Sequence, residues 1–132
     1  MADTPSDSLR IDLIAPEQVA GGEPVAMTLR LENVAGRPVD LYLMGRTIAF
    51  DLIVEDEAGA EVWNRLHDQV LQQILRVEHL APGDTLTLED TWPQRSNAGS
   101  SVPPGDYRVR GEIFTEGEPL TAGPVPLRIV GR

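Results

Sequence analysis

Apolar and polar residues alternate with a period of two along much of the chain. In residues 25–31 apolar side chains occupy every second position, namely Val25, Met27, Leu29 and Leu31. A strand with one buried face gives this pattern, because successive side chains of a strand point to opposite faces. The same period recurs in segments 9–13, 47–54 and 85–89. The pattern therefore predicts several half-buried strands.

Turn sequences rich in glycine and proline separate these segments. They lie at 21–24, 35–38, 57–59, 82–84, 104–106 and 116–119. Residues 54–63 form the clearest predicted hairpin, with Gly59 suited to a left-handed position in a bulged turn. Short strands at this spacing are typical of an antiparallel sandwich or barrel.

One stretch fits two structures. Apolar residues recur at intervals of four or five positions, as on one face of a helix, at Leu66, Val70, Leu71, Ile74 and Leu75. This spacing is compatible with a short helix over 67–73. Leu75, Val77 and Leu80 lead into a Pro-Gly turn, as a strand would. Helix and strand both stay open for residues 67–73.

Composition narrows the class of protein. The chain has 132 residues, a net charge of −10 and no cysteine. We expect one domain over residues 9–132 after a disordered tail over residues 1–8. Absent cysteine excludes disulfides, thiol nucleophiles and thiolate metal sites, and absent lysine excludes Schiff-base chemistry and a P-loop.

The net charge of the chain also indicates which classes of partner it can bind. A strongly acidic chain repels phosphate backbones and anionic headgroups, so we expect neither nucleic acid nor membrane as a partner. The longest apolar run covers only residues 41–44, and the acidic N-terminus lacks the features of a signal peptide. We expect a soluble, cytoplasmic protein.

Four stretches resemble the BsuPI-type family of intracellular proteinase inhibitors. They are G-E-P-V-A-M-T-L-R-L-E-N-V-A-G-R-P-V-D-L (22–41), F-D-L-I-V-E-D-E-A-G-A-E-V-W (50–63), L-A-P-G-D-T-L-T-L-E-D-T-W (80–92) and P-P-G-D-Y-R-V-R-G (103–111). The resemblance covers about residues 9–130 and implies an all-β fold, an immunoglobulin-like antiparallel β-sandwich of seven to nine strands. It also implies a non-enzymatic protein that binds a proteinase, with a serine proteinase as the expected class.

Four residues suggest structural roles. Tyr107 follows Pro-Gly-Asp and is placed to fold back onto the backbone as a tyrosine corner. Trp63 and Trp92 are expected to anchor the core between the sheets, with ligand stacking as the alternative. Asn33, at a strand end, is expected to cap local backbone in a turn.

The sequence offers no convincing catalytic or metal site. Its two imidazoles, His67 and His79, lack both a G-x-S-x-G nucleophile and an H-E-x-x-H motif. Acidic residues 55–57, with Asp51 or Glu61, suggest a calcium site, but a solvated hairpin tip explains them as well. We therefore predict no catalytic residue, no metal and no cofactor.

Partner binding is expected in the loops that a rigid sandwich carries. The longest segment without a strand pattern is 93–104, which is bounded by prolines. Arg95 would enter an acidic specificity pocket, with Ser96 and Asn97 beside it. The small residues of 96–101 predict a flexible middle that a proteinase could cut.

A second candidate is the exposed segment 44–46, where Met44 would fill an apolar pocket and Arg46 follows it; a hairpin tip is the alternative. The competing function is a structural or adhesive module that binds a partner strand along an exposed sheet edge. The target and the oligomeric state stay open.

Overall fold

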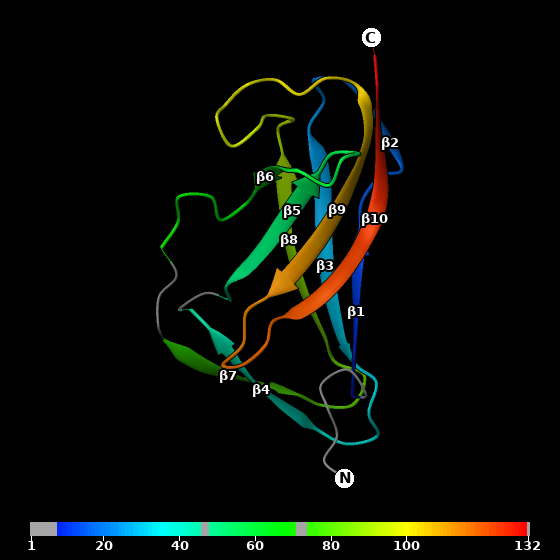
Figure 1. Ribbon diagram of the computed structural model, residues 1–132. Helices are drawn as coiled ribbons and strands as arrows, with labels where there is room; N and C mark the ends of the chain where they lie inside the picture. Colours follow the sequence, from blue (N-terminus) through cyan, green and yellow to red (C-terminus); the bar gives the residue numbers. More distant parts are fainter. Residues whose placement is uncertain (1–7, 46–47, 71–73, 132) are drawn as a thin grey trace.

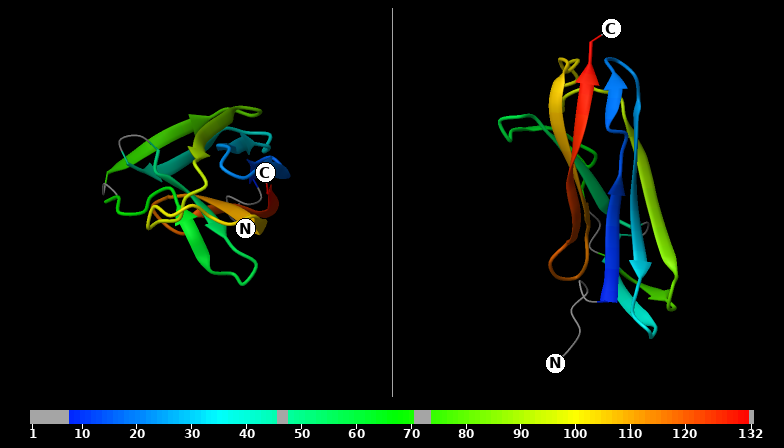
Figure 2. Two further views of the ribbon diagram at one scale, coloured as in Figure 1. Left: turned by 90° about the horizontal axis from the view of Figure 1, so that it is seen from above. Right: turned by 90° about the vertical axis from the view of Figure 1, so that its right-hand side faces the viewer.

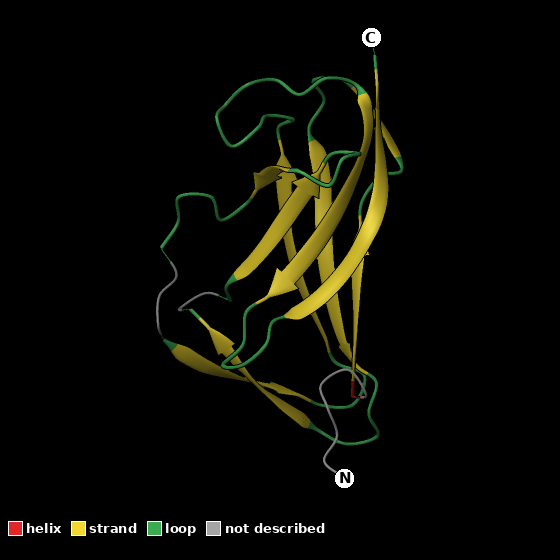
Figure 3. Cartoon of the chain, viewed as in Figure 1, coloured by secondary structure: helices red, strands yellow, loops and turns green. Residues whose placement is uncertain are grey.

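The computed structural model describes residues 8–45, 48–70 and 74–131, and its regular elements are ten strands. These are β1 (Leu9–Ile14), β2 (Gln18–Ala20), β3 (Val25–Asn33), β4 (Val39–Met44), β5 (Phe50–Glu55), β6 (Glu61–Asn64), β7 (Leu75–Leu80), β8 (Thr85–Trp92), β9 (Gly105–Ile113) and β10 (Leu120–Val130). Figure 3 shows the chain in strand and loop colours, with helix colour only beside the N-terminal grey trace. The all-β prediction is confirmed.

Two sheets face each other as the layers of a sandwich (Figure 2). One has the strand order β1-β3-β8 and the other the order β2-β10-β9-β5-β6. The chain passes from the first layer to the second between β1 and β2. The core lies between these layers.

Strands β4 and β7 form a third, two-stranded sheet at the lower end of the sandwich (Figure 1). Its antiparallel register runs from Val39 opposite Leu80 to Met44 opposite Leu75. Leu41 and Leu43 from β4 join the buried core. A bridge between Leu43 and Thr115 ties the ribbon to the turn that follows β9. The ribbon therefore closes this end of the molecule.

The period-two pattern predicts the core correctly in β3. The four alternate residues there, Val25, Met27, Leu29 and Leu31, are fully buried. In β5 the half-buried pattern was wrong, since Asp51 and Ile53 are buried along with the residues between them. On this second face the Asp51 carboxylate accepts hydrogen bonds from Asn64 Nδ2 at 3.1 Å and from the Leu66 N–H at 3.0 Å, so the segment at the end of β6 lies against β5.

The strand count and one pairing differ from the expected antiparallel set of seven to nine. The three-residue β2 is too short to show a period in the sequence. It pairs in parallel with β10, with Gln18 opposite Arg128. Because β2 keeps the direction of the chain leaving β1 while it changes sheets, it meets β10 running the same way.

The possible helix over 67–73 does not appear in its described part. Residues 67 and 68 belong to a turn, residues 69 and 70 have no regular structure, and Val70 is 92% exposed rather than packed against a core. Residues 71–73 lie outside the described residues. No helix in the described ranges is long and apolar enough to cross a membrane.

The predicted tail over 1–8 lies almost wholly outside the described residues. Ser8 is described and buried, and its carbonyl accepts a hydrogen bond from the Val34 N–H at 2.9 Å.

Candidate functional site

The loop over residues 93–104 joins β8 to β9 across the upper end of the sandwich (Figure 1). The buried side chain of Gln94 holds its first residues in place. Gln94 Nε2 donates to the carbonyls of Ala20 and Glu23 at 2.9 and 2.8 Å, and its Oε1 accepts from the Gly22 N–H at 3.0 Å. This one amide therefore ties the loop to the turn between β2 and β3.

The middle of the loop is closed by its own hydrogen bonds. Ser96 N–H donates to the Ser100 carbonyl at 2.8 Å, and Gly99 N–H donates to the Ser96 carbonyl at 2.9 Å. The Arg95 guanidinium folds back, with Nη1 donating to the Gly99 carbonyl at 3.0 Å. The predicted flexible stretch is thus a compact, hydrogen-bonded turn, because its small residues allow the backbone to bond to itself.

Asn97 fastens this turn to the edge of β6. Its N–H donates to the Val62 carbonyl at 3.0 Å, and its Oδ1 accepts from the Asn64 N–H at 3.0 Å. Asn97 Nδ2 also donates to Asn64 Oδ1 at 3.1 Å, and Asn64 Nδ2 donates to Asp51 Oδ2 at 3.1 Å. A polar chain thus links the loop to buried β5.

Three aromatic residues underlie the loop. Trp92 is fully buried, and its ring centroid lies 6.0 Å from that of Trp63 and 6.1 Å from that of Tyr107. Trp92 stands in the three-stranded sheet and the other two in the five-stranded sheet, so the cluster spans both layers. Trp92 Nε1 donates to the Arg95 carbonyl at 2.9 Å.

Tyr107 supports the far end of the loop. Its hydroxyl donates to the Pro103 carbonyl at 2.5 Å, four residues back in the chain. Burial raises the pKa of the Tyr107 phenol, and the nearby charge of Asp56 raises it further. Both effects favour the neutral phenol, which is the form that donates this hydrogen bond.

Asn33 lies at the other end of the molecule, where β3 leaves the sheet. Its Oδ1 accepts from the Ala35 N–H at 2.9 Å, which closes a local turn. Its Nδ2 donates to the carbonyls of Arg37 and Leu80, both at 2.9 Å. Asn33 therefore also connects the end of β3 to the end of β7.

The structure separates the two groups of predicted partner-binding residues. Arg95, Ser96 and Asn97 lie together in the upper loop, with Arg95 exposed and the other two half-buried. Met44 ends β4 at the lower end, opposite Leu75. The strands on either side of segment 44–46, β4 and β5, belong to different sheets and do not pair with each other as a hairpin. Arg46 lies outside the described residues.

Two of the acidic residues that suggested a calcium site, Asp51 and Asp56, accept hydrogen bonds from backbone N–H groups. Asp51 is buried, and its Oδ1 accepts from the N–H groups of Leu52 and Leu66, both at 3.0 Å. Asp56 Oδ1 accepts from the N–H groups of Ala58 and Ala60 and so shapes the β5–β6 turn. In the described ranges, no group of three or more His, Asp or Glu side chains could hold a metal ion.

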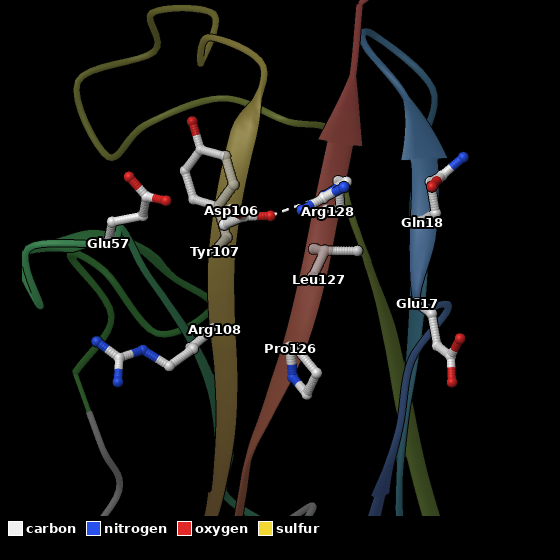
Figure 4. A pocket seen from close by; sticks show the side chains of 9 residues that line it. All are labelled: Glu17, Gln18, Glu57, Asp106, Tyr107, Arg108, Pro126, Leu127 and Arg128. Carbon is white, nitrogen blue, oxygen red and sulfur yellow. Dashed lines mark hydrogen bonds and ion pairs between the residues drawn. The ribbon is translucent and has the colours of Figure 1, made fainter.

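A shallow depression of about 710 Å³ lies over β9 and β10 (Figure 4). Asp106 Oδ1 and Arg128 Nε pair across it at 2.9 Å. The hydrogen bond from Arg128, followed by its charge, lowers the pKa of the Asp106 carboxyl. Glu17, Glu57 and Arg108 complete a lining of mixed charge that favours no single class of ligand.

Sequence reasoning missed Gln94, the residue that anchors the loop. A glutamine in a polar loop carries no period and no motif. It is buried here at φ 58°, a backbone conformation that non-glycine residues seldom adopt. Its role depends on the contact between the loop and the distant turn of residues 20–23, so no local pattern could have found it.

Solved structures similar to this chain show the same architecture. A CARDB domain from Pyrococcus furiosus, solved in complex with di-metal ions, has a TM-score of 0.50 and 15% identity, with 92% of this chain and 87% of that chain covered. The alkylpurine DNA glycosylase AlkC of Pseudomonas fluorescens, bound to DNA containing an abasic site analog, has a TM-score of 0.51 and 17% identity over 92% of this chain and 30% of that one. A β-glucosidase from Erythrobacter marinus has a TM-score of 0.51 and 12% identity over 93% and 15%.

At such low identity these likenesses show the fold alone, an immunoglobulin-like β-sandwich. The chain spans less than a third of the glycosylase and of the β-glucosidase. A search of curated proteins found no match. The family model described as BsuPI, intracellular proteinase inhibitor, matches residues 14–118, a range that includes the 93–104 loop and the β4–β7 ribbon. This match covers most of the sequence, and the chain belongs to the BsuPI intracellular proteinase inhibitor family.

Proposed function

We propose that this protein inhibits a serine proteinase inside the cell and contacts it through the 93–104 loop. The family is one of intracellular proteinase inhibitors, and its model covers the whole loop. The observation that supports the proposal most is the fixation of the loop, by Gln94 at its start and Asn97 in its middle. A preorganised loop loses little conformational entropy on binding.

Arg95 is the proposed anchor of this contact. Its side chain is exposed, and a hydrogen bond from Nη1 to the Gly99 carbonyl holds it against the loop. Exchanging that bond for a carboxylate in an enzyme pocket replaces a neutral acceptor with a charged one, which strengthens the hydrogen bond. A trypsin-like enzyme, whose specificity pocket is acidic, is therefore the proposed target for this residue.

The test is residual activity of trypsin-like and subtilisin-like enzymes against a titration of the full chain, with gel analysis for cleavage. Arg95→Ala is expected to weaken inhibition of the trypsin-like enzyme by about 100-fold, since an interface anchor can contribute several kcal/mol. Arg108→Ala, another exposed arginine, is the matched control and should leave inhibition unchanged. A subtilisin-like enzyme has an apolar pocket, so for that class we expect contact with Met44 at the lower end in place of the loop, and Met44→Ala should then have the larger effect.

Two results would overturn the proposal. One is full enzyme activity at a large molar excess of the protein with both enzyme classes. The other is rapid cleavage after Arg95, which would make the loop a substrate. Either result would favour a module that binds through an exposed sheet edge, for which β8 is the candidate. Within the described ranges β8 pairs only with β3.

A further inference from the structure

The β4–β7 ribbon has an unusual distribution of side chains. In an antiparallel pair, residues opposite each other share a face, and successive residues alternate between faces. Leu41 and Leu43 of β4 are buried in the core, so the residues opposite them in β7 face the same way. Those residues are Glu78 and Arg76, which form an ion pair at 2.7 Å.

The outward face of the same ribbon carries one polar pair, Asp40 opposite His79, followed by apolar residues. Tyr42 lies opposite Val77, and Met44 lies opposite Leu75. The exposed fractions are 45% for Tyr42, 42% for Val77 and 53% for Leu75. On β7, Leu80 therefore faces the core together with Arg76 and Glu78, whereas Leu75 and Val77 face water. We call the outward residues Tyr42, Met44, Leu75 and Val77 the ribbon face.

The ribbon face forms one continuous patch. Directly opposed side chains in an antiparallel pair stand about 5 Å apart at Cβ, and the next pair on the same face follows about 7 Å along the strands. Single exposed apolar residues are ordinary, but adjoining ones mark a surface that binds another molecule. The buried Leu80, opposite Val39, accounts for which face of β7 meets the core, but it does not require apolar side chains at positions 75 and 77, which stay exposed.

Charge beside the ribbon face specifies what it would bind. A depression of about 340 Å³ begins at Tyr42, and its lining includes Leu41, Leu120 and three carboxylates from Asp40, Glu116 and Glu118. Asp40 pairs with the exposed His79 at 2.6 Å. Hydrogen bonds from the Gly117 N–H to Thr115 Oγ1 and from that hydroxyl to the Glu118 carbonyl hold the turn of residues 115–118. The depression combines an apolar wall with negative charge.

These features exclude two other occupants. A second copy would bring the same carboxylates and a net charge of −10 against this face. Four side chains also fall short of the roughly 800 Å² per partner that a stable dimer buries. Residues 1–7 of this chain contain two aspartates and no basic residue, so they lack the complementary charge.

We propose that the ribbon face is a second binding surface, and that it takes a protein segment whose apolar side chains cover Tyr42 and Val77 while an adjacent Lys or Arg enters the carboxylate-lined depression. The aliphatic stem of such a side chain would lie on Tyr42 and Leu120, with its charged end toward Glu116 and Glu118. The surface lies at the opposite end of the sandwich from the 93–104 loop (Figure 1). One molecule therefore binds two partners, or two sites on one partner, and this inference does not depend on proteinase inhibition.

The test uses three synthetic hexapeptides and the full chain, with NMR chemical-shift changes as the readout. The probe is acetyl-Lys-Leu-Val-Phe-Ser-Lys-amide; a second peptide has glutamate for both lysines, and a third has serine for its three apolar residues. We expect the first peptide to bind, with shifts confined to β4, β7 and turn 115–118. The other two should bind at least about tenfold more weakly, because each lacks one of the two complementary features.

Variants locate the interaction. Val77→Ser is expected to weaken binding of the lysine peptide at least about fivefold. The double variant Glu116→Gln, Glu118→Gln should weaken binding of the lysine peptide by a similar factor. It should not weaken binding of the glutamate peptide, because it removes negative charge. Glu89→Gln, at an exposed carboxylate of β8 outside the ribbon face, is the matched control and should leave binding of the lysine peptide unchanged. A well-dispersed amide spectrum establishes that each variant is folded.

Four outcomes would overturn the proposal. They are no binding of the lysine peptide at millimolar concentration, equal binding of the lysine and glutamate peptides, shifts centred on β9 and β10, and concentration-dependent dimers in sedimentation that Val77→Ser abolishes. Proteinase inhibition is measured separately, so failure of either idea leaves the other standing.

Discussion

The upper loop and the β4–β7 ribbon lie at opposite ends of one sandwich and are built in opposite ways. The loop of residues 93–104 is polar in sequence, yet Gln94 within it is buried and bonded to three backbone groups. The ribbon is rich in apolar residues, yet Tyr42, Leu75 and Val77 are exposed. Polarity in the sequence therefore does not tell which of the two regions is fixed by the rest of the fold.

The physical reason lies in the contacts that each kind of side chain can make. A glutamine amide accepts and donates hydrogen bonds at the same time, so one side chain can pair several backbone groups. An aliphatic residue on a two-stranded ribbon can be buried only on the side that has a second layer. Mutations in the loop should therefore lower the stability of the protein, whereas mutations of the ribbon face should change only its binding.

Gln94→Ala should have the largest effect of the changes that test this comparison. It leaves the N–H of Gly22 and the carbonyls of Ala20 and Glu23 without the amide that pairs them. A hydrogen bond contributes about 1 kcal/mol net, so losing the three bonds of this amide should lower the free energy of unfolding in urea by about 3 kcal/mol. Gln18→Ala, at an exposed glutamine of β2, should change the free energy of unfolding by less than about 0.5 kcal/mol. Equal effects of the two variants would show that Gln94 does not hold the loop.

Asn97→Ala should have an intermediate effect. It removes the side-chain bonds to Asn64 but leaves the bond from its own N–H to the Val62 carbonyl. We expect a loss of about 1–2 kcal/mol and faster cleavage of the loop in limited proteolysis. Asn97→Asp keeps the oxygen that accepts from the Asn64 N–H, so its loss should be smaller. A cleavage rate that stays the same in Asn97→Ala would contradict fixation through β6.

The effect of pH on the stability of a Tyr107 variant tests the hydrogen bond at the far end of the loop. Tyr107→Phe should cost about 1 kcal/mol near neutral pH, because the Pro103 carbonyl loses its donor. Burial first, and the charge of Asp56 second, raise the pKa of this phenol above the ordinary 10.0. The unfolded chain then ionises first, so the stabilisation is complete below pH 10 and declines as the pH rises toward the folded-state pKa.

Urea unfolding of both proteins across this range provides the measurement. The difference between the two proteins in free energy of unfolding should narrow above pH 10. A constant difference would mean that the folded chain accepts the ionised phenol as readily as water does.

The β-sandwich could be predicted from the sequence because the alternation of apolar and polar residues is periodic. The alternation in β3 and the Pro-Gly turns are local patterns, and they depend on nothing outside their own segments. The Tyr107 position after Pro-Gly-Asp is also local, since its hydroxyl bonds only four residues back. Such features can be read directly from a single sequence.

The two candidate surfaces could not be read in the same way. Arg95 and Met44 were identified as exposed residues, but the fixation of the loop depends on segments near Ala20 and Asn64, far along the chain. In β7 the alternation of charged and apolar residues predicts two different faces, but it does not indicate which face packs against the core. That choice follows from the register with β4, where Leu43 stands opposite Arg76. Long-range pairing decides it, and single-strand periodicity carries no information about pairing.

The smallest expected effect is the stability change in Val77→Thr, which tests the ribbon side of the comparison. Threonine keeps the β-branched shape that favours a strand and adds only a hydroxyl, which water can solvate at a position 42% exposed. We therefore expect the free energy of unfolding to change by no more than about 0.5 kcal/mol, while binding of the lysine hexapeptide weakens. The matched control is Val109→Thr in β9, where the side chain is fully buried and the new hydroxyl would lack water; a loss of about 1–3 kcal/mol is expected there. If Val77→Thr destabilises the chain as much as Val109→Thr, the ribbon face is part of the packed core, and the contrast between the two regions fails.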